Sequence, residues 1–159
     1  MKSARIAYIA LLSALAAVFG YIESLFPLPI PIPGIKLGLS NIAVLFALIR
    51  MNKTDAFFVM LIKVFICALL FSGVSGLFYS LAGGLFSFFA MCVFEKYDFS
   101  VIGTSMAGGV FHNLGQITAA AIMLSSVGAF YYFPILMIAG LIVGAAVGML
   151  CSAVISRLK

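Results

Sequence analysis

The segment FPILMIAGLIVGAAVGMLCSAVI, residues Phe133 to Ile155, contains no charged side chain and is followed by the basic residues Arg157 and Lys159. A helix rises about 1.5 Å per residue, so this segment spans about 34 Å as a helix. The hydrocarbon core of a bilayer is about 30 Å thick. The segment therefore predicts a transmembrane helix that ends in a polar, basic tail.

The rest of the chain repeats this pattern. Hydrophobic residues make up 65% of the sequence and charged residues 8%, whereas soluble domains are roughly 45–50% apolar and about 25% charged. We expect one all-α membrane domain over residues 1–159, a bundle of six transmembrane helices. The five further spans are expected at residues 4–26, 37–49, 56–71, 77–94 and 100–126, with a Ser/Gly-rich turn at 72–76 between the third and the fourth.

Charge distribution predicts the orientation. Nine Lys/Arg against four Asp/Glu give a net charge of +5, but these basic residues cluster at span ends, as in membrane topology signals, and form no phosphate-binding face for nucleic acid. Six spans place seven basic residues on one side, and the opposite loops hold only Lys36. We therefore expect both termini in the cytoplasm of a cell with a bacterial-type plasma membrane. The seven residues are Lys2, Arg5, Arg50, Lys53, Lys96, Arg157 and Lys159.

The residues after the first span form a proline cluster, Pro27, Pro29, Pro31 and Pro33, that cannot continue a helix. We expect this loop, Pro27 to Lys36, outside the cell. Ala14-Leu15-Ala16 resembles a signal-peptide cleavage site, but the apolar run continues to Phe26, so we expect a retained span.

Small residues form strips on two predicted helices. Ala7, Ala10, Ala14 and Ala17 share one face of the first span, which another helix can approach closely. Either a helix of the same chain or a separate subunit fits this face. Gly140, Gly144, Gly148 and Ser152 make a similar strip on the last span, where we expect internal packing.

Lys63 is the one basic residue deep within a span, and a charge at membrane depth faces a partner or a wet cavity. It is a candidate ligand-binding residue. The alternative is a structural pairing with Glu23, near the outer end of the first span.

His112, Asn113 and Gln116 form the most polar intramembrane stretch. His112 and Gln116 share a helix face, and Asn113 lies about 100° around from His112. These side chains either bind a ligand or hydrogen-bond to neighbouring helices. In a six-span bundle they can meet Glu23, Lys36 and Lys63 in its outer half, which predicts a pocket for an anionic or strongly polar molecule. Apolar walls are expected from Phe19, Phe65 and Phe111.

Several motifs are missing from the sequence. It has no phosphate-binding G-x-x-x-x-G-K-[ST], no G-x-S-x-G and no paired histidines. Cys67, Cys92 and Cys151 lie in apolar runs, typical of buried small hydrophobes. We therefore expect neither enzymatic activity nor a metal or other cofactor, and the energy for any transport must come from a partner or an ion gradient.

Three features together carry a resemblance: the alanine strip, the stretch Pro33-Gly34-Ile35-Lys36-Leu37-Gly38-Leu39-Ser40-Asn41, and the stretch Gly108-Gly109-Val110-Phe111-His112-Asn113-Leu114-Gly115-Gln116. The chain resembles the membrane proteins called heptaprenyl diphosphate synthase component I or Gx transporter. These in turn look like substrate-binding S components of energy-coupling factor (ECF) transporters.

The resemblance implies a six-helix capture subunit that binds a vitamin-like, quinone-precursor or isoprenoid-related molecule from outside. Its partners would be an ECF transmembrane coupling subunit, contacted through Ala10 and Ala14, and two ATPase subunits. Asn41, which ends the first of the quoted stretches, joins the candidate ligand-binding residues. Two alternatives stay open: an accessory subunit of a prenyl diphosphate synthase, since the Asp-rich magnesium segments of the catalytic subunit are missing, and a proton-coupled carrier that uses Lys63 and His112.

Overall fold

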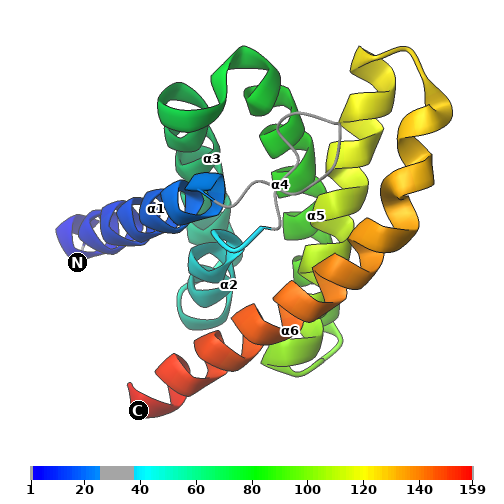
Figure 1. Cartoon of the computed structure of the whole chain (residues 1–159). Coiled ribbons are helices and arrows are strands. Elements are labelled where there is room, and N and C mark those ends of the chain that lie inside the picture. The colour runs from blue at the N-terminus through cyan, green and yellow to red at the C-terminus, as the bar shows by residue number, and fades with distance from the viewer. Residues whose placement is uncertain (1, 26–37, 159) are drawn as a thin grey trace.

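The computed structural model describes residues 2–25 and 38–158, and these are almost entirely helical (Figure 1). The α-helices α3, α4 and α5 run roughly side by side, while α1 and α6 slant across them. The predicted all-α class is confirmed. The elements are α1 (Lys2–Leu25), α2 (Asn41–Arg50), α3 (Lys53–Cys67), the π-helix η1 (Ala68–Ser72), α4 (Gly73–Lys96), α5 (Val101–Met123), the 3-10 helix η2 (Val127–Tyr132) and α6 (Phe133–Arg157).

The six separate helices expected from the sequence are not found in that form. In the described residues α3, η1 and α4 follow one another from Lys53 to Lys96 with no non-helical segment between them, and η2 leads directly into α6, so five helical segments result. The predicted turn at 72–76 lies where the chain reverses direction, although its residues belong to the end of η1 and the start of α4. Gly73 has φ +65° and ψ −169°, outside the helical region, and a positive φ is a conformation that glycine adopts without a steric penalty.

The segment from Lys53 to Lys96 folds back on itself at this glycine. Lys53 of α3 forms an ion pair of 2.9 Å with Glu95 of α4, and the ring centroids of Phe57 and Phe88 are 5.4 Å apart. Residues early in α3 therefore contact residues late in α4. The two helices are therefore antiparallel neighbours, which is compatible with the prediction of two successive spans joined by a turn.

Three segments are long and apolar enough to cross a membrane by length and composition: Ser3–Leu25, Lys53–Lys96 and Val127–Arg157. These segments indicate a membrane location. The ten residues of α2 give a length of about 15 Å, half of the bilayer core. Helix α5 is long enough, but its polar residues, among them His112, Asn113 and Gln116, lower its mean hydropathy below that of the other segments.

Glycines set the spacing between α5 and α6. A Cβ atom on Gly109 would overlap the backbone oxygen of Gly140, and one on Gly144 would lie 2.7 Å from Cα of Met106. A Cβ on Gly148 would lie 2.7 Å from Cα of Ile102. The glycine strip of the last span therefore packs against α5, as expected, with the two backbones in direct contact.

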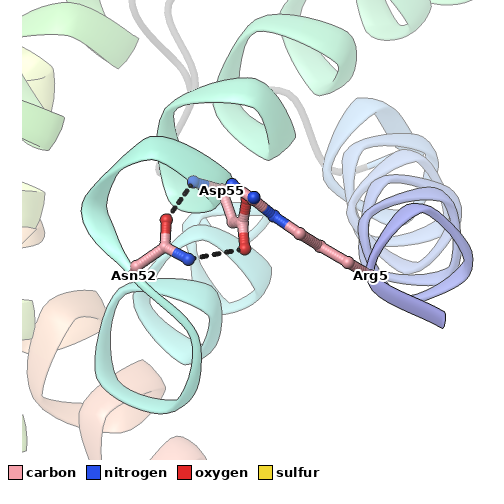
Figure 2. A network of polar contacts seen from close by, with 3 residues as sticks. All are labelled: Arg5, Asn52 and Asp55. Atoms are coloured by element: carbon pink, nitrogen blue, oxygen red, sulfur yellow. Dashed lines mark hydrogen bonds and ion pairs between the residues drawn. The ribbon is translucent and has the colours of Figure 1, made fainter. Parts of the chain in front are cut away.

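One end of the bundle is polar and holds both ends of the chain. Arg5 of α1 donates through Nε and Nη2 to Oδ1 of Asp55, at 2.7 and 2.5 Å, and Asn52 donates to Oδ2 of Asp55 at 2.8 Å (Figure 2). Asn52 also caps α3 by accepting from the backbone N–H of Asp55. Arg50 donates to the backbone oxygen of Leu158 at 3.2 Å. The predicted clustering of basic residues at one end is thus present for Arg5, Arg50 and Lys53.

Candidate functional site

A small polar cavity lies where four α-helices and the junction before α2 meet. Its volume is about 10 Å³, which is room for about one water molecule. It brings together one cationic, one carboxylate and one imidazole side chain that are far apart in the sequence. The lining residues are Gly20 and Glu23 of α1, Ser40 of the junction, Lys63, Val64 and Cys67 of α3, Ser80 of α4 and His112 of α5.

Lys63 reaches this cavity from α3 and is 4% exposed. Its Nζ donates to Oδ1 of Asn41, the first residue of α2, at 2.5 Å. Nδ2 of Asn41 in turn donates to Oγ of Ser87 on α4 at 3.4 Å. Lys63 and Asn41, two of the candidate ligand-binding residues, are therefore in direct contact, and the contacts of Asn41 connect α2, α3 and α4.

Glu23 approaches the cavity from α1 and is buried. One carboxylate oxygen accepts from the backbone N–H of Gly38 and, at 3.2 Å, from that of Leu39. The other oxygen accepts from Oγ of Ser40 at 3.5 Å. Glu23 and Lys63 line the same cavity, so the sequence prediction correctly placed these two distant side chains together.

His112 and Gln116 form a pair on α5. Nε2 of Gln116 lies 3.1 Å from Nε2 of His112, and both side chains are buried. A Cβ on Gly83 of α4 would come within 3.0 Å of both, so this glycine makes room for the pair. Gly38 packs against the other edge of the imidazole, since a Cβ there would lie 3.1 Å from Cδ2 of His112.

Asn113 does not line the cavity, although it was predicted beside His112. Its Nδ2 donates to the backbone oxygen of Leu136 on α6 at 2.6 Å, and its Oδ1 is buried without a hydrogen-bond donor among the described residues. The 100° offset between neighbouring helix positions turns it toward α6. Lys36, the remaining predicted site residue, lies outside the described residues, as does the proline loop.

A second cavity of about 10 Å³ lies between α4, α5 and α6. Gly38 and Asn41 contribute to it, and the same two residues are bonded to Glu23 and Lys63 of the first cavity. Known small-molecule sites enclose about 300–1,000 Å³. Both cavities are therefore far smaller than such a site, and the segment Gly38–Asn41 borders both of them. The other lining residues are Met91, Ser105, Gly108, Gly109, Val143, Gly144 and Val147.

The predicted aromatic walls lie elsewhere. Phe65 is 50% and Phe111 39% exposed, and neither these two nor Phe19 line either of the two cavities. Phe111 instead borders an apolar surface groove between α4 and α5 together with Phe86 and Phe89. Phenylalanine on a membrane helix suits lipid contact as well as a pocket wall, so residue type alone could not distinguish the two.

The first span's alanine strip is not used for internal packing over most of its length. Ala7, Ala10 and Ala14 are exposed, whereas Leu12 and Ala16 on the other face of α1 are buried against the bundle. Of the two alternatives that the sequence left open, packing within the chain is therefore wrong for these three alanines.

Three serines of the site were not predicted from the sequence. Ser40 and Ser80 line the first cavity, and Ser87 bonds Asn41. Ser80 and Ser87 are seven residues apart on α4, a spacing that keeps both on one helix face. Within the described residues no group of three His, Cys, Asp or Glu side chains is placed to hold a metal ion. The donors present suit hydrogen bonding to a polar or anionic group.

Comparison with known proteins identifies the family. No curated protein and no solved structure matches the chain. The family model for heptaprenyl diphosphate synthase component I matches residues 12–154, which include every described lining residue of both cavities. The chain belongs to the heptaprenyl diphosphate synthase component I family.

Proposed function

We propose that this chain is the substrate-capturing S component of an ECF-type importer. It is a multi-pass protein of the plasma membrane with both termini in the cytoplasm. It has no catalytic activity of its own and binds a small anionic or strongly polar molecule from outside.

The polar interior supports the capture role. Lys63, Glu23 and His112 converge within an otherwise apolar helical chain. Charged groups inside a membrane protein are costly and mark ligand or ion sites. The contacts of Arg5 with Asp55 and of Arg50 with Leu158 support termini on the same side, because they bring both chain ends to one polar end.

The exposed alanine face of α1 is the observation that carries the ECF assignment. Ala10 and Ala14 are accessible on a helix whose opposite face is buried. Small residues allow two membrane helices to approach closely, so this face suits a docked coupling subunit. The cost of leaving it uncovered is low in lipid, which explains why it can exist without the partner.

Co-purification with a coexpressed ECF module tests the proposal. We expect the double substitution Ala10→Leu and Ala14→Leu to abolish association while the protein stays folded, because each added side chain separates the two helices. The matched control is Ala146→Leu with Ala153→Leu, the same change at two exposed alanines of α6. Association that survives the α1 substitutions would contradict the S-component role.

A second function is supported by the family description alone, which names a component of heptaprenyl diphosphate synthase. In that case the chain would be a membrane accessory subunit of a soluble synthase. Co-purification with the catalytic subunit, and a changed product chain length on its addition, would favour this alternative over an ECF partner.

A further inference from the structure

The last turn of α1 is attached to the start of α2 by a single carboxylate. Glu23 accepts hydrogen bonds from three consecutive residues, the backbone N–H of Gly38 and Leu39 and the hydroxyl of Ser40. These residues come directly before Asn41, where α2 begins. Glu23 therefore connects α1 to a segment that contributes to both cavities, Ser40 to the first and Gly38 and Asn41 to the second.

The three donors form an anion site. Gly38 has φ +89°, and this conformation directs two successive backbone N–H groups at one oxygen of Glu23. Such successive N–H groups, and the N-terminus of a helix, both favour a bound anion. In this structure the anion is a side chain of the protein itself.

The surroundings of the carboxylate favour an anion as well. Lys63, which is 4% exposed, and His112 line the same cavity as Glu23, together with the hydroxyls of Ser40 and Ser80. The cavity has room for about one water molecule. A ligand with an anionic group can therefore reach these donors only by replacing the carboxylate that now fills their site.

We propose that Glu23 is the internal occupant of the ligand's oxyanion site, and that a carboxylate or phosphate group of the ligand displaces it and releases the end of α1. This inference rests on the proposed capture function and assigns its regulation. Displacement frees the segment Gly38–Asn41 to move, which joins the two cavities into one. It also converts ligand binding into a movement of α1.

The other end of α1 stays attached during this movement. Arg5 is held by Asp55, and Asp55 is held by Asn52 (Figure 2). None of these three residues lines either cavity. Release at Glu23 would remove the polar attachment at this end of α1, although Leu12 and Ala16 pack against the bundle. A pivot of α1 about Arg5 would also turn the exposed face with Ala10 and Ala14. Ligand binding at the site would thereby change the position of the α1 face that is proposed to dock the coupling subunit.

Thiol cross-linking of the full chain tests the proposal. Tyr21 of α1 and Phe71 of η1 have ring centroids 5.4 Å apart, so these positions are neighbours. Tyr21→Cys with Phe71→Cys, joined by a short bifunctional thiol reagent and with the native cysteines replaced by alanine, reports the position of the end of α1. The probes are acetate and inorganic phosphate, with chloride at equal ionic strength as the reference. The two probes distinguish a carboxylate ligand group from a phosphate group.

We expect acetate or phosphate to slow cross-linking by about tenfold or more, on the order of the loss of one charged hydrogen bond. Glu23→Gln should slow it to a similar degree without any probe. The matched control is Glu95→Gln, the same change at the ion pair with Lys53, and it should leave the rate unchanged. Wild-type cross-linking that responds to neither probe, or an unchanged rate in Glu23→Gln, overturns the proposal.

The assay uses this chain alone, so its outcome is separable from the ECF assignment. Release of α1 by an oxyanion in a chain that never binds an ECF module would refute the proposed function and keep the role of Glu23. If the chain binds an ECF module but Glu23→Gln leaves the cross-linking rate unchanged, the role of Glu23 is refuted and the proposed function is kept.

Discussion

Replacing Lys63 with methionine keeps most of the side-chain volume and removes the charge. The structure shows what is lost: a bond of 2.5 Å from Nζ to Asn41 in a site where Lys63 is 4% exposed. Hydrogen bonds to charged groups contribute about 1.5–3 kcal/mol, and neutral ones about 0.5–1.5 kcal/mol. If a ligand takes the charged bond in the open site, Lys63→Met should weaken binding about 10- to 100-fold.

Gln116→Leu is the matched neutral comparison. Its amide contacts Nε2 of His112 at 3.1 Å, and its loss should weaken binding by only about 2- to 10-fold. The ligand is first recovered by mass spectrometry of the molecules that the purified wild type retains, and then titrated against each variant. A retained ligand that is cationic would contradict the charge argument.

Thermal unfolding of the same variants separates binding from structure. If Lys63 serves only as the partner of Glu23, Lys63→Met should lower the melting temperature by leaving a buried carboxylate, and Glu23→Gln should restore it. Unchanged ligand affinity in both Lys63→Met and His112→Ala would refute the site.

Three further outcomes are expected. Pro31→Cys, in a chain without the native cysteines, should react with an impermeant thiol reagent in intact cells; reaction only after the inner face is exposed would reverse the topology. Gly109→Ala should destabilise the protein by about 1–3 kcal/mol because its Cβ would meet Gly140, whereas Gly103→Ala, with its closest contact at 3.4 Å, should not; equal melting temperatures would contradict the backbone contact. Asn113→Leu should leave ligand affinity unchanged, because Asn113 faces α6. A loss of affinity as large as that of Lys63→Met would show that Asn113 belongs to the site.

The helices that could be predicted from the sequence are those whose limits are set by composition. The last span was expected at 133–155 and is found as Phe133–Arg157, because an uninterrupted apolar run ends at a basic residue. The limits of α2 depend instead on tertiary contacts, since Glu23 and the positive φ of Gly38 fix the residues before Asn41. The π-helix η1 has no comparable signature, because Ala68 to Ser72 are ordinary helix-compatible residues.

The parts of the candidate site that could be predicted are the charged side chains, because a buried charge requires polar surroundings. Lys63 and Glu23 had to find polar surroundings in an apolar chain, and both line one cavity. The amide of Asn113 could be satisfied either in the cavity or by a backbone carbonyl of α6. The sequence does not distinguish the two, because the choice depends on how α6 packs. The exposure of Ala10 and Ala14 was likewise undetermined, because a small residue is compatible with either face of a membrane helix.

The glycine contact between α5 and α6 also determines how the site responds to the bilayer. Transmembrane helices adjust their tilt to the thickness of the surrounding hydrocarbon. Where Gly109 meets Gly140 the two backbones touch, so no side chain is present to absorb a change in the angle of α6. A thinner or thicker membrane that tilts α6 must therefore also tilt α5, and His112 moves with it.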